Sequence, residues 1–270
     1  PVDENLLYEL HYGNNLISYA PSYAQSIENA LPDDVEPHFM AIIGESVAAI
    51  QIDGEWQGVL QDLNPGSGYW VNVDTALDFS YNNNQPRANK RKPIKKYPEG
   101  FEFAQYAQSS EQAFYFIKEV SLENSRPTEN DWILSYCGDV VVGARQYQEG
   151  YFDVPVMGYN SDEETMNYCE PGDIPRLKLL RQNGDIIDLN AELPPFTSNG
   201  IHIVEILSEA DLLPSDYALE NAYPNPFNPT TTISFTLPEN NHVSIAIYDI
   251  QGRMISLLVD GNIEAGHHFV

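Results

Sequence analysis

The chain has 270 residues, of which 42% are hydrophobic, enough to build one large domain or two to three small ones with buried cores. Its 40 acidic and 13 basic residues give a net charge of -27 at pH 7, which repels nucleic acid and anionic membrane surfaces, so we expect neither as a partner. No apolar run approaches the ~20 residues of a membrane helix, so we expect no membrane span, and the start at Pro1 without a signal peptide indicates a processed or excerpted piece.

Residues 1–82 have the pattern of a β-rich module. Turn residues recur about every 8 to 12 positions along the whole chain, and β-branched or aromatic residues fill the runs between them, which is typical of an all-β protein. The stretch "AAIQIDGEWQGVL" predicts a hairpin about Asp53-Gly54, a pair that suits a tight primed turn. The best helical candidate is "SIENAL", from Ser26 to Leu31, which is short.

Residues 83–98 are a linker by composition. The stretch is rich in Pro and Asn, and no acidic residue interrupts its basic cluster. Six of the 13 basic residues of the chain lie here: Arg87, Lys90, Arg91, Lys92, Lys95 and Lys96. Because the rest of the chain is so acidic, the cluster is either a plain solvated linker or docks on an acidic surface of this chain or of a neighbour.

Residues 99–210 predict a β-sandwich module. Asn183-Gly184, in "RLKLLRQNGDIIDL", is the strongest short-range hairpin signal of the sequence. The stretch from Ser109 to Val120 could be helical, since it starts with a plausible cap, but "AFYFI" is aromatic and too continuous for one helical face. We therefore expect a strand there.

Cys137 and Cys169 are the two cysteines of the chain. They could form a disulfide, act as a redox pair or be two unrelated buried thiols, and no CxxC spacing supports metal or redox chemistry. A bridge would close a loop of about 32 residues, with a stabilisation of roughly 3 to 4 kcal/mol on the chain-entropy estimate. Such a bridge favours an oxidising compartment.

Residues 211–270 open with a run of prolines. Pro224, Pro226 and Pro229 remove hydrogen-bond donors and fix φ, so the segment that contains them suits a sheet edge or an inter-domain elbow rather than a central strand. After it, Ile233, Phe235 and Leu237 alternate with polar residues. Val243, Ile245 and Ile247 repeat that pattern after a turn at Pro238 to Asn241, which predicts a half-buried antiparallel pair.

The same region carries two ordered motifs, in "YPNPFNPTTTISFTLPE" and "IYDIQGRMISLLVDG". They resemble the C-terminal sorting domain of proteins exported by the type IX secretion system of Bacteroidetes and allied phyla, a pattern shared with the immunoglobulin-like module of flagellar hook-capping proteins. The matching residues are Tyr223, Pro224, Asn225 and Pro226 in the opening motif, and Asp249, Gly252 and Arg253 in the central D-x-x-G-R motif.

This resemblance implies a small β-sandwich that is recognised by the secretion machinery of the outer membrane, and often then cleaved off or replaced by a surface glycolipid anchor. It places the protein outside the cell or on the outer surface of a Gram-negative bacterium. The family domain runs on to a basic terminal strand, whereas this chain stops at Val270, so we expect the last module, 211–270, to be incomplete. The fold class expected is therefore all-β, with tandem immunoglobulin-like β-sandwich modules.

No residue pattern singles out a catalytic or metal site, and we expect neither an enzyme nor a cofactor. Ser46, in "GESVA", mimics part of a nucleophile elbow, but the helix that such an elbow requires does not follow. The six histidines are scattered without metal-ligand spacing. The clusters Asp33-Asp34-Val35-Glu36 and Asp162-Glu163-Glu164 could hold Ca²⁺, yet neither has the spacing of a dedicated loop, so solvated loops are the favoured interpretation.

Trp56 is the aromatic residue with the best case for a ligand or an interface, because it follows the Asp53-Gly54 turn. Two functions remain open. One is a structural or adhesive protein that self-associates through strand edges and the basic linker, as the subunit of a filament or layer would. The alternative is a polysaccharide-binding ancillary region of a secreted hydrolase.

Overall fold

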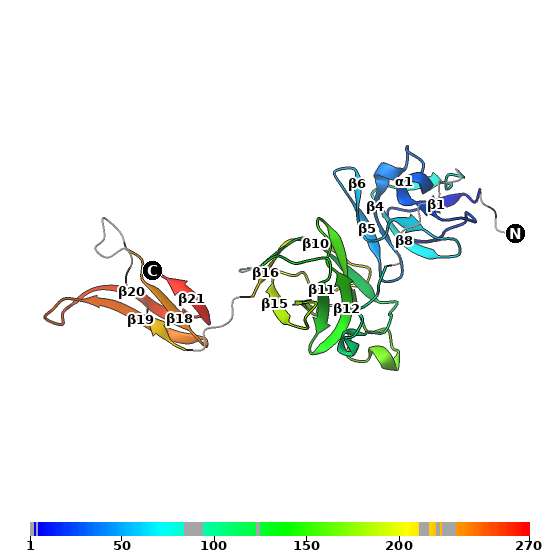
Figure 1. Cartoon of the computed structure of the whole chain (residues 1–270). Coiled ribbons are helices and arrows are strands. Elements are labelled where there is room, and N and C mark those ends of the chain that lie inside the picture. Colours follow the sequence, from blue (N-terminus) through cyan, green and yellow to red (C-terminus); the bar gives the residue numbers. More distant parts are fainter. Residues whose placement is uncertain are drawn as a thin grey trace. The chain divides into compact units, whose positions relative to one another are not determined.

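The computed structural model describes residues 3, 5–83, 94–122, 125–210, 216–219, 222 and 231–270, without the side chains of residues 267 and 269. In this part of the chain the fold is nearly all β, as predicted (Figure 1). One short helix, α1 (Ile27–Ala30), forms where the sequence predicts it. The chain divides into two compact units, residues 1–209 and residues 210–270.

The first sheet of the N-terminal unit has five strands in the described residues. Both Asp53 (φ +54°) and Gly54 (φ +83°) are left-handed, so the predicted primed hairpin between β5 and β6 is confirmed. The strand order is β2 (Gly13–Ser18), β8 (Gly68–Val73), β4 (Phe39–Ile43), β5 (Ala48–Ile52) and β6 (Glu55–Gly58). Two short pairs flank it: β1 (Tyr8–Leu10) with β9 (Leu77–Phe79), and β3 (Gln25–Ser26) with β7 (Asp62–Leu63).

The second sheet of the same unit has seven strands in the described residues. Its order is β12 (Val140–Gln146), β11 (Trp132–Cys137), β14 (Arg176–Leu180), β15 (Ile186–Asn190), β16 (Ile201–Glu209), β10 (Gln112–Ser121) and β13 (Phe152–Met157). The predicted hairpin at Asn183-Gly184 joins β14 to β15. The pairing of β10 with β16 is parallel, whereas the others in this sheet are antiparallel.

The two outer strands of this sheet, β12 and β13, lie side by side without a backbone ladder, although both are described in full. The carbonyl of Pro155 faces this seam, since it accepts a hydrogen bond from the Ser135 hydroxyl at 2.7 Å. The N–H and C=O of a strand residue point to the same edge of the strand. Proline has no N–H, so Pro155 cannot donate a backbone hydrogen bond across the seam to β12. Arg145 Nε closes the seam instead, by donating to the carbonyl of Asp153 at 2.7 Å.

The apolar residues of β10 follow one another without interruption because both faces of this strand are buried. Tyr115 and Ile117 point into the core of the seven-stranded sheet, whereas Phe114 and Phe116 pack against β4 and β5 of the five-stranded sheet. One face of β10 therefore packs against β4 and β5, and this contact joins the two sheets. The strand predicted over Ser109 to Val120 is confirmed.

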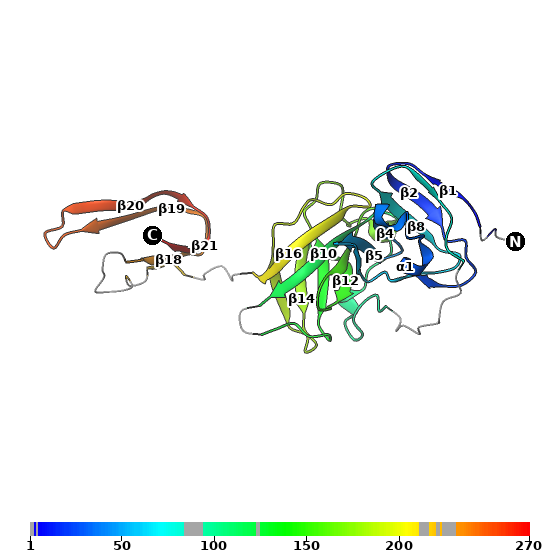
Figure 2. The same ribbon diagram turned by 90° about the horizontal axis from the view of Figure 1, so that it is seen from above.

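The C-terminal unit holds a three-stranded sheet and a separate hairpin in its described part (Figure 2). The sheet has the order β17 (Ala218–Leu219), β18 (Ser234–Leu237) and β21 (Gly266–Phe269), and the hairpin consists of β19 (Asn241–Tyr248) and β20 (Met254–Ile263). Strand β18 buries Phe235 and Leu237, in line with the predicted alternation.

The predicted pairing of this strand with the next one, from Val243 to Ile247, is wrong. Strands β17 and β21 occupy the two edges of β18, and β19 pairs with β20. The chain crosses from one sheet to the other between Leu237 and Asn241, where the Asn240 side chain accepts the Ala265 N–H at 2.7 Å. Alternation of buried residues gives the face of each strand but does not determine its neighbour.

Candidate functional site

The D-x-x-G-R motif forms the turn of the β19–β20 hairpin. The N–H of Asp249 donates to the carbonyl of Arg253 at 2.9 Å, and the N–H of Gly252 donates to the carbonyl of Asp249 at 3.0 Å. Gly252 has a φ of +78°, a left-handed conformation that glycine adopts without a steric cost. The motif therefore encodes a three-residue hairpin loop that ends in a glycine bulge.

The side chain of Asp249 completes this turn. Its Oδ1 accepts the N–H groups of Gln251 and Arg253, both at 2.9 Å, and its Oδ2 accepts Arg253 Nε at 2.7 Å. Hydrogen bonds from Arg253, first from its backbone and then from its guanidinium, hold the pKa of Asp249 below its ordinary value. The three predicted motif residues are thus brought together, and their polar groups serve the turn itself.

The apex of the same turn presents an apolar side chain. Ile250 is fully exposed, at 104% of its reference accessible area. Sequence reasoning missed this residue, although its position between the motif's Asp249 and Gly252 could have indicated it. The other predicted motif, Tyr223, Pro224, Asn225 and Pro226, lies outside the described residues.

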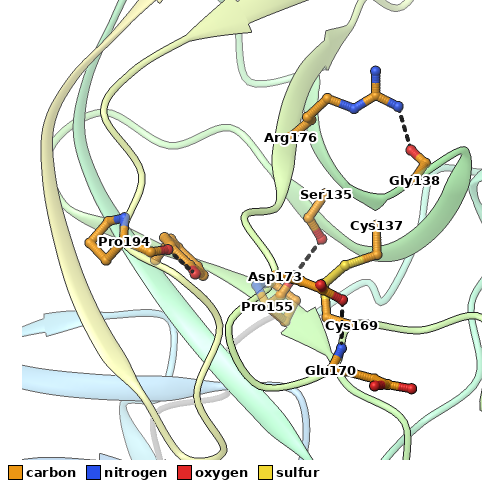
Figure 3. Close-up of a disulfide and its surroundings, with 10 residues drawn as sticks. Ser135, Cys137, Gly138, Pro155, Cys169, Glu170, Asp173, Arg176 and Pro194 are labelled. Atoms are coloured by element: carbon orange, nitrogen blue, oxygen red, sulfur yellow. Dashed lines mark hydrogen bonds between the residues drawn. A yellow bond between two sulfur atoms is a disulfide. The ribbon is translucent and has the colours of Figure 1, made fainter.

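Cys137 and Cys169 form the disulfide that the sequence suggested (Figure 3). Cys137 is the last residue of β11, and Cys169 lies in the long connection between β13 and β14. Their Cα atoms are 5.4 Å apart, and both side chains are buried. Next to the bridge, the Glu170 N–H donates to Asp173 Oδ2 at 2.8 Å, so the connection is also fastened directly after Cys169.

A buried ion pair, which sequence reasoning missed, joins β12 to β13 at the place where the two sheets of the N-terminal unit meet. Arg145 lies 2.9 Å from Asp153 Oδ2, and the two side chains are 3% and 0% exposed. Asp153 also accepts the N–H groups of Ala48, at 3.1 Å, and Val59, at 2.7 Å, from the five-stranded sheet and its continuation. A single charge of each sign in the apolar runs "VVVGARQY" and "YFDVPVMGY" was the available signal.

Ser46 is buried in the turn between β4 and β5 and has a φ of +59°. Its hydroxyl bonds to the amide oxygen of Gln108, and its carbonyl accepts a hydrogen bond from Arg145. Strand β5 follows the turn, so the strand-turn-helix arrangement of a nucleophile elbow is not formed. The groups around Ser46 fasten the two sheets together.

Trp56 lies half-buried on β6, against the core of the five-stranded sheet. Its indole N–H donates to Glu36 Oε1 at 2.7 Å. Burial is the main cause of a raised pKa at Glu36, although the bond from Trp56 acts in the opposite direction. The structure thus places one carboxylate and one partly accessible ring side by side, and a ligand role for Trp56 stays a prediction.

Within the described residues, no group of three or more His, Cys, Asp or Glu side chains is placed to hold a metal ion. In the same part of the chain, no helix combines the length and apolar character needed to cross a membrane.

Comparison with known proteins gives a family match for the segment that contains the β19–β20 hairpin. Residues 221–266 match the family described as secretion system C-terminal sorting domain. The resemblance seen in the two motifs is therefore confirmed for this segment, which contains β18, β19 and β20. No curated protein and no solved structure shows significant similarity to the chain.

The class of protein follows from this match and the fold. The chain is an all-β protein whose C-terminal segment is a type IX sorting domain, and such a domain indicates export through that secretion machinery to the cell surface or the medium.

Proposed function

We propose that the protein is a non-catalytic structural or adhesive component of the extracellular side of a Gram-negative bacterium, delivered there by its C-terminal unit. The observation that supports this most is the sorting-domain match over residues 221–266, together with a fully formed D-x-x-G-R turn within it. The N-terminal unit is then the part that acts after export.

The construction of the N-terminal unit favours a durable structural part. A disulfide, a buried ion pair and the apolar contact of β10 with β4 and β5 hold it together. Disulfides persist in oxidising surroundings such as the cell exterior. Each of these features resists unfolding, whereas none of them forms an accessible reaction centre.

Surface features of the same unit support self-association. Leu16 is 63% exposed on β2, which is an outer strand of the five-stranded sheet in the described residues. Two side chains of the basic linker already contact acidic or aromatic groups of the chain: Lys95 lies 3.2 Å from Glu99, and Lys96 lies over the ring of Tyr106. Outer strands and charge pairing are two routes by which copies of a chain join.

Electron microscopy and light scattering on the purified protein, in moderate and in high salt, test this role. We expect ordered assemblies that loosen in high salt, because salt screens the charge contacts. Leu16→Lys should weaken assembly, whereas Ile174→Lys, at a loop position of similar exposure, should not. Monodisperse particles under both conditions would exclude self-assembly, and a hydrolytic activity lost in Ser46→Ala would contradict the non-catalytic part.

Polysaccharide binding is the second candidate, and the Trp56–Glu36 pair is what favours it. An aromatic ring beside a hydrogen-bonding carboxylate combines stacking with polar recognition. A glycan screen with the parent chain and Trp56→Ala would test it, with Tyr12→Ala as a control at a well-exposed ring. If both variants still bound the glycan, Trp56 would not be part of the binding site.

A further inference from the structure

Among the described residues of the C-terminal unit, the most exposed apolar side chain lies at the turn end of the β19–β20 hairpin. This turn end projects beyond β18 and β21 in both views (Figures 1 and 2). Besides the fully exposed Ile250, five large apolar side chains near the turn are 42% to 65% exposed. We call these six residues the hairpin tip: Ile247, Tyr248, Ile250, Met254, Ile255 and Leu257.

The hairpin tip is also uncharged. From Val243 to Val259 the charged residues are Asp249 and Arg253, and these two are bound to each other within the turn. The net charge of this stretch is therefore zero, in a chain whose net charge is -27. A cluster of exposed apolar side chains at the neutral end of one hairpin, on an otherwise strongly acidic protein, marks an interaction site.

Hydrogen bonds within the turn hold the backbone of the hairpin tip in one conformation. Two backbone bonds close the loop, and three bonds to the Asp249 carboxylate hold its far side. Two register shifts in the β19–β20 ladder, after Ile245 and after Ile247, change which side chains face outward near the turn. The hairpin thus presents a preformed set of aliphatic and aromatic side chains, as binding hot spots require.

We propose that the hairpin tip is the surface by which the C-terminal unit is recognised, and that its partner is an apolar, uncharged groove on a protein of the export machinery. This inference rests on the proposed export function and adds the contacting side chains and the chemistry of the partner. A hairpin tip without a free basic residue does not suit an anionic lipid surface, and the self-association proposed for this chain uses β2 and the basic linker of the N-terminal unit rather than this tip.

Export of the full chain from a bacterium with a type IX system tests the proposal. Ile250→Ser removes the apex side chain without touching a turn bond, and we expect the exported fraction to fall by about tenfold or more. Leu219→Ser, at a position 66% exposed on β17 of the same unit, should be exported like the parent. Ile250→Leu should also be exported normally, and an unchanged thermal transition will show that the serine variant is folded.

Three results would overturn the inference. One is normal export of Ile250→Ser while deletion of residues 210–270 abolishes export, which would leave the proposed function intact. The second is binding of the parent to anionic vesicles, or dimerisation by light scattering, that Ile250→Ser loses while its export is normal, since the tip would then serve a lipid or a second copy. The third is unimpaired export of the 210–270 deletion, which would refute the proposed function as well.

Discussion

Arg145 and Asp153 show how two residues determine the arrangement of the N-terminal unit. Arg145 closes the seam between β12 and β13 through the Asp153 carbonyl, and the Asp153 carboxylate binds two backbone N–H groups of the neighbouring sheet. Both side chains are removed from water, and the loss of hydration of the two charges is offset by their mutual attraction and by the hydrogen bonds from these N–H groups.

We predict that Arg145→Met lowers the free energy of unfolding of the N-terminal unit by about 3–5 kcal/mol, because Asp153 is left as a buried charge without its partner. Urea unfolding followed by tryptophan fluorescence measures this change. Lys118→Met is the control, since it removes an exposed ion pair with Glu205 and should leave the transition in place. Equal effects of both substitutions would contradict the assigned role of the buried pair.

Asp249 gives a prediction about pH. Its pKa is lower in the folded hairpin than in the unfolded chain, so the stability it contributes is fully present above the ordinary aspartate value of about 4 and is lost as the pH falls through the lowered pKa. NMR signals of the Gln251 N–H and Arg253 Nε–H should therefore stay at their bonded positions down to about pH 4 and shift only below it. A shift between pH 5 and 7 would show that the carboxylate is not held in this way.

At the scale of elements, the seam between β12 and β13 requires a residue without a side chain. A Cβ at Gly143 would lie 1.9 Å from the Pro155 carbonyl oxygen, whereas one at Gly68, on β8, would meet nothing closer than 3.8 Å. Neither glycine has a left-handed φ, so the two positions differ in the space around them rather than in backbone strain.

Gly143→Ala should therefore destabilise the N-terminal unit by roughly 1–3 kcal/mol or more, because backbone has to move to admit the methyl group. Gly68→Ala should be neutral, or stabilising by about 0.4–1 kcal/mol through a less flexible unfolded chain. Thermal unfolding of the two variants compares them directly. A similar loss in both would mean that the seam is not tightly closed.

The elements also show which parts of the fold can be read from sequence. The turns at Asp53-Gly54 and Asn183-Gly184 and the strand predicted over Ser109 to Val120 are determined by local residue preferences, and all three are present. The partner of β18 was mispredicted, because pairing between strands depends on contacts far apart in sequence. The parallel pairing of β10 with β16 has the same origin.

The residues of the candidate site also fall into those that local sequence predicts and those that only the fold brings together. Asp249, Gly252 and Arg253 could be predicted because the turn that they build is local. Arg145 and Asp153 could not, since their pairing appears only after two strands and a second sheet come together. Ile250 needed the structure for another reason: exposure is a property of the folded hairpin.

For the whole molecule, the single disulfide distinguishes the two units. Both cysteines lie in residues 1–209, so reduction affects the N-terminal unit alone. We predict two calorimetric transitions, of which one moves to lower temperature in Cys137→Ser/Cys169→Ser, with a loss of roughly 3–4 kcal/mol for the opened loop. A shift of both transitions would indicate that the units unfold as one.

Export by the C-terminal unit is the central claim, and one measurement tests it most directly. The full chain, placed behind an inner-membrane export signal, is expressed in a bacterium with a type IX system and in the matched strain that lacks it, and the protein is then quantified in the medium, on the surface and in the periplasm. We predict surface or medium protein in the first strain and periplasmic retention in the second. The same distribution in both strains would contradict the account.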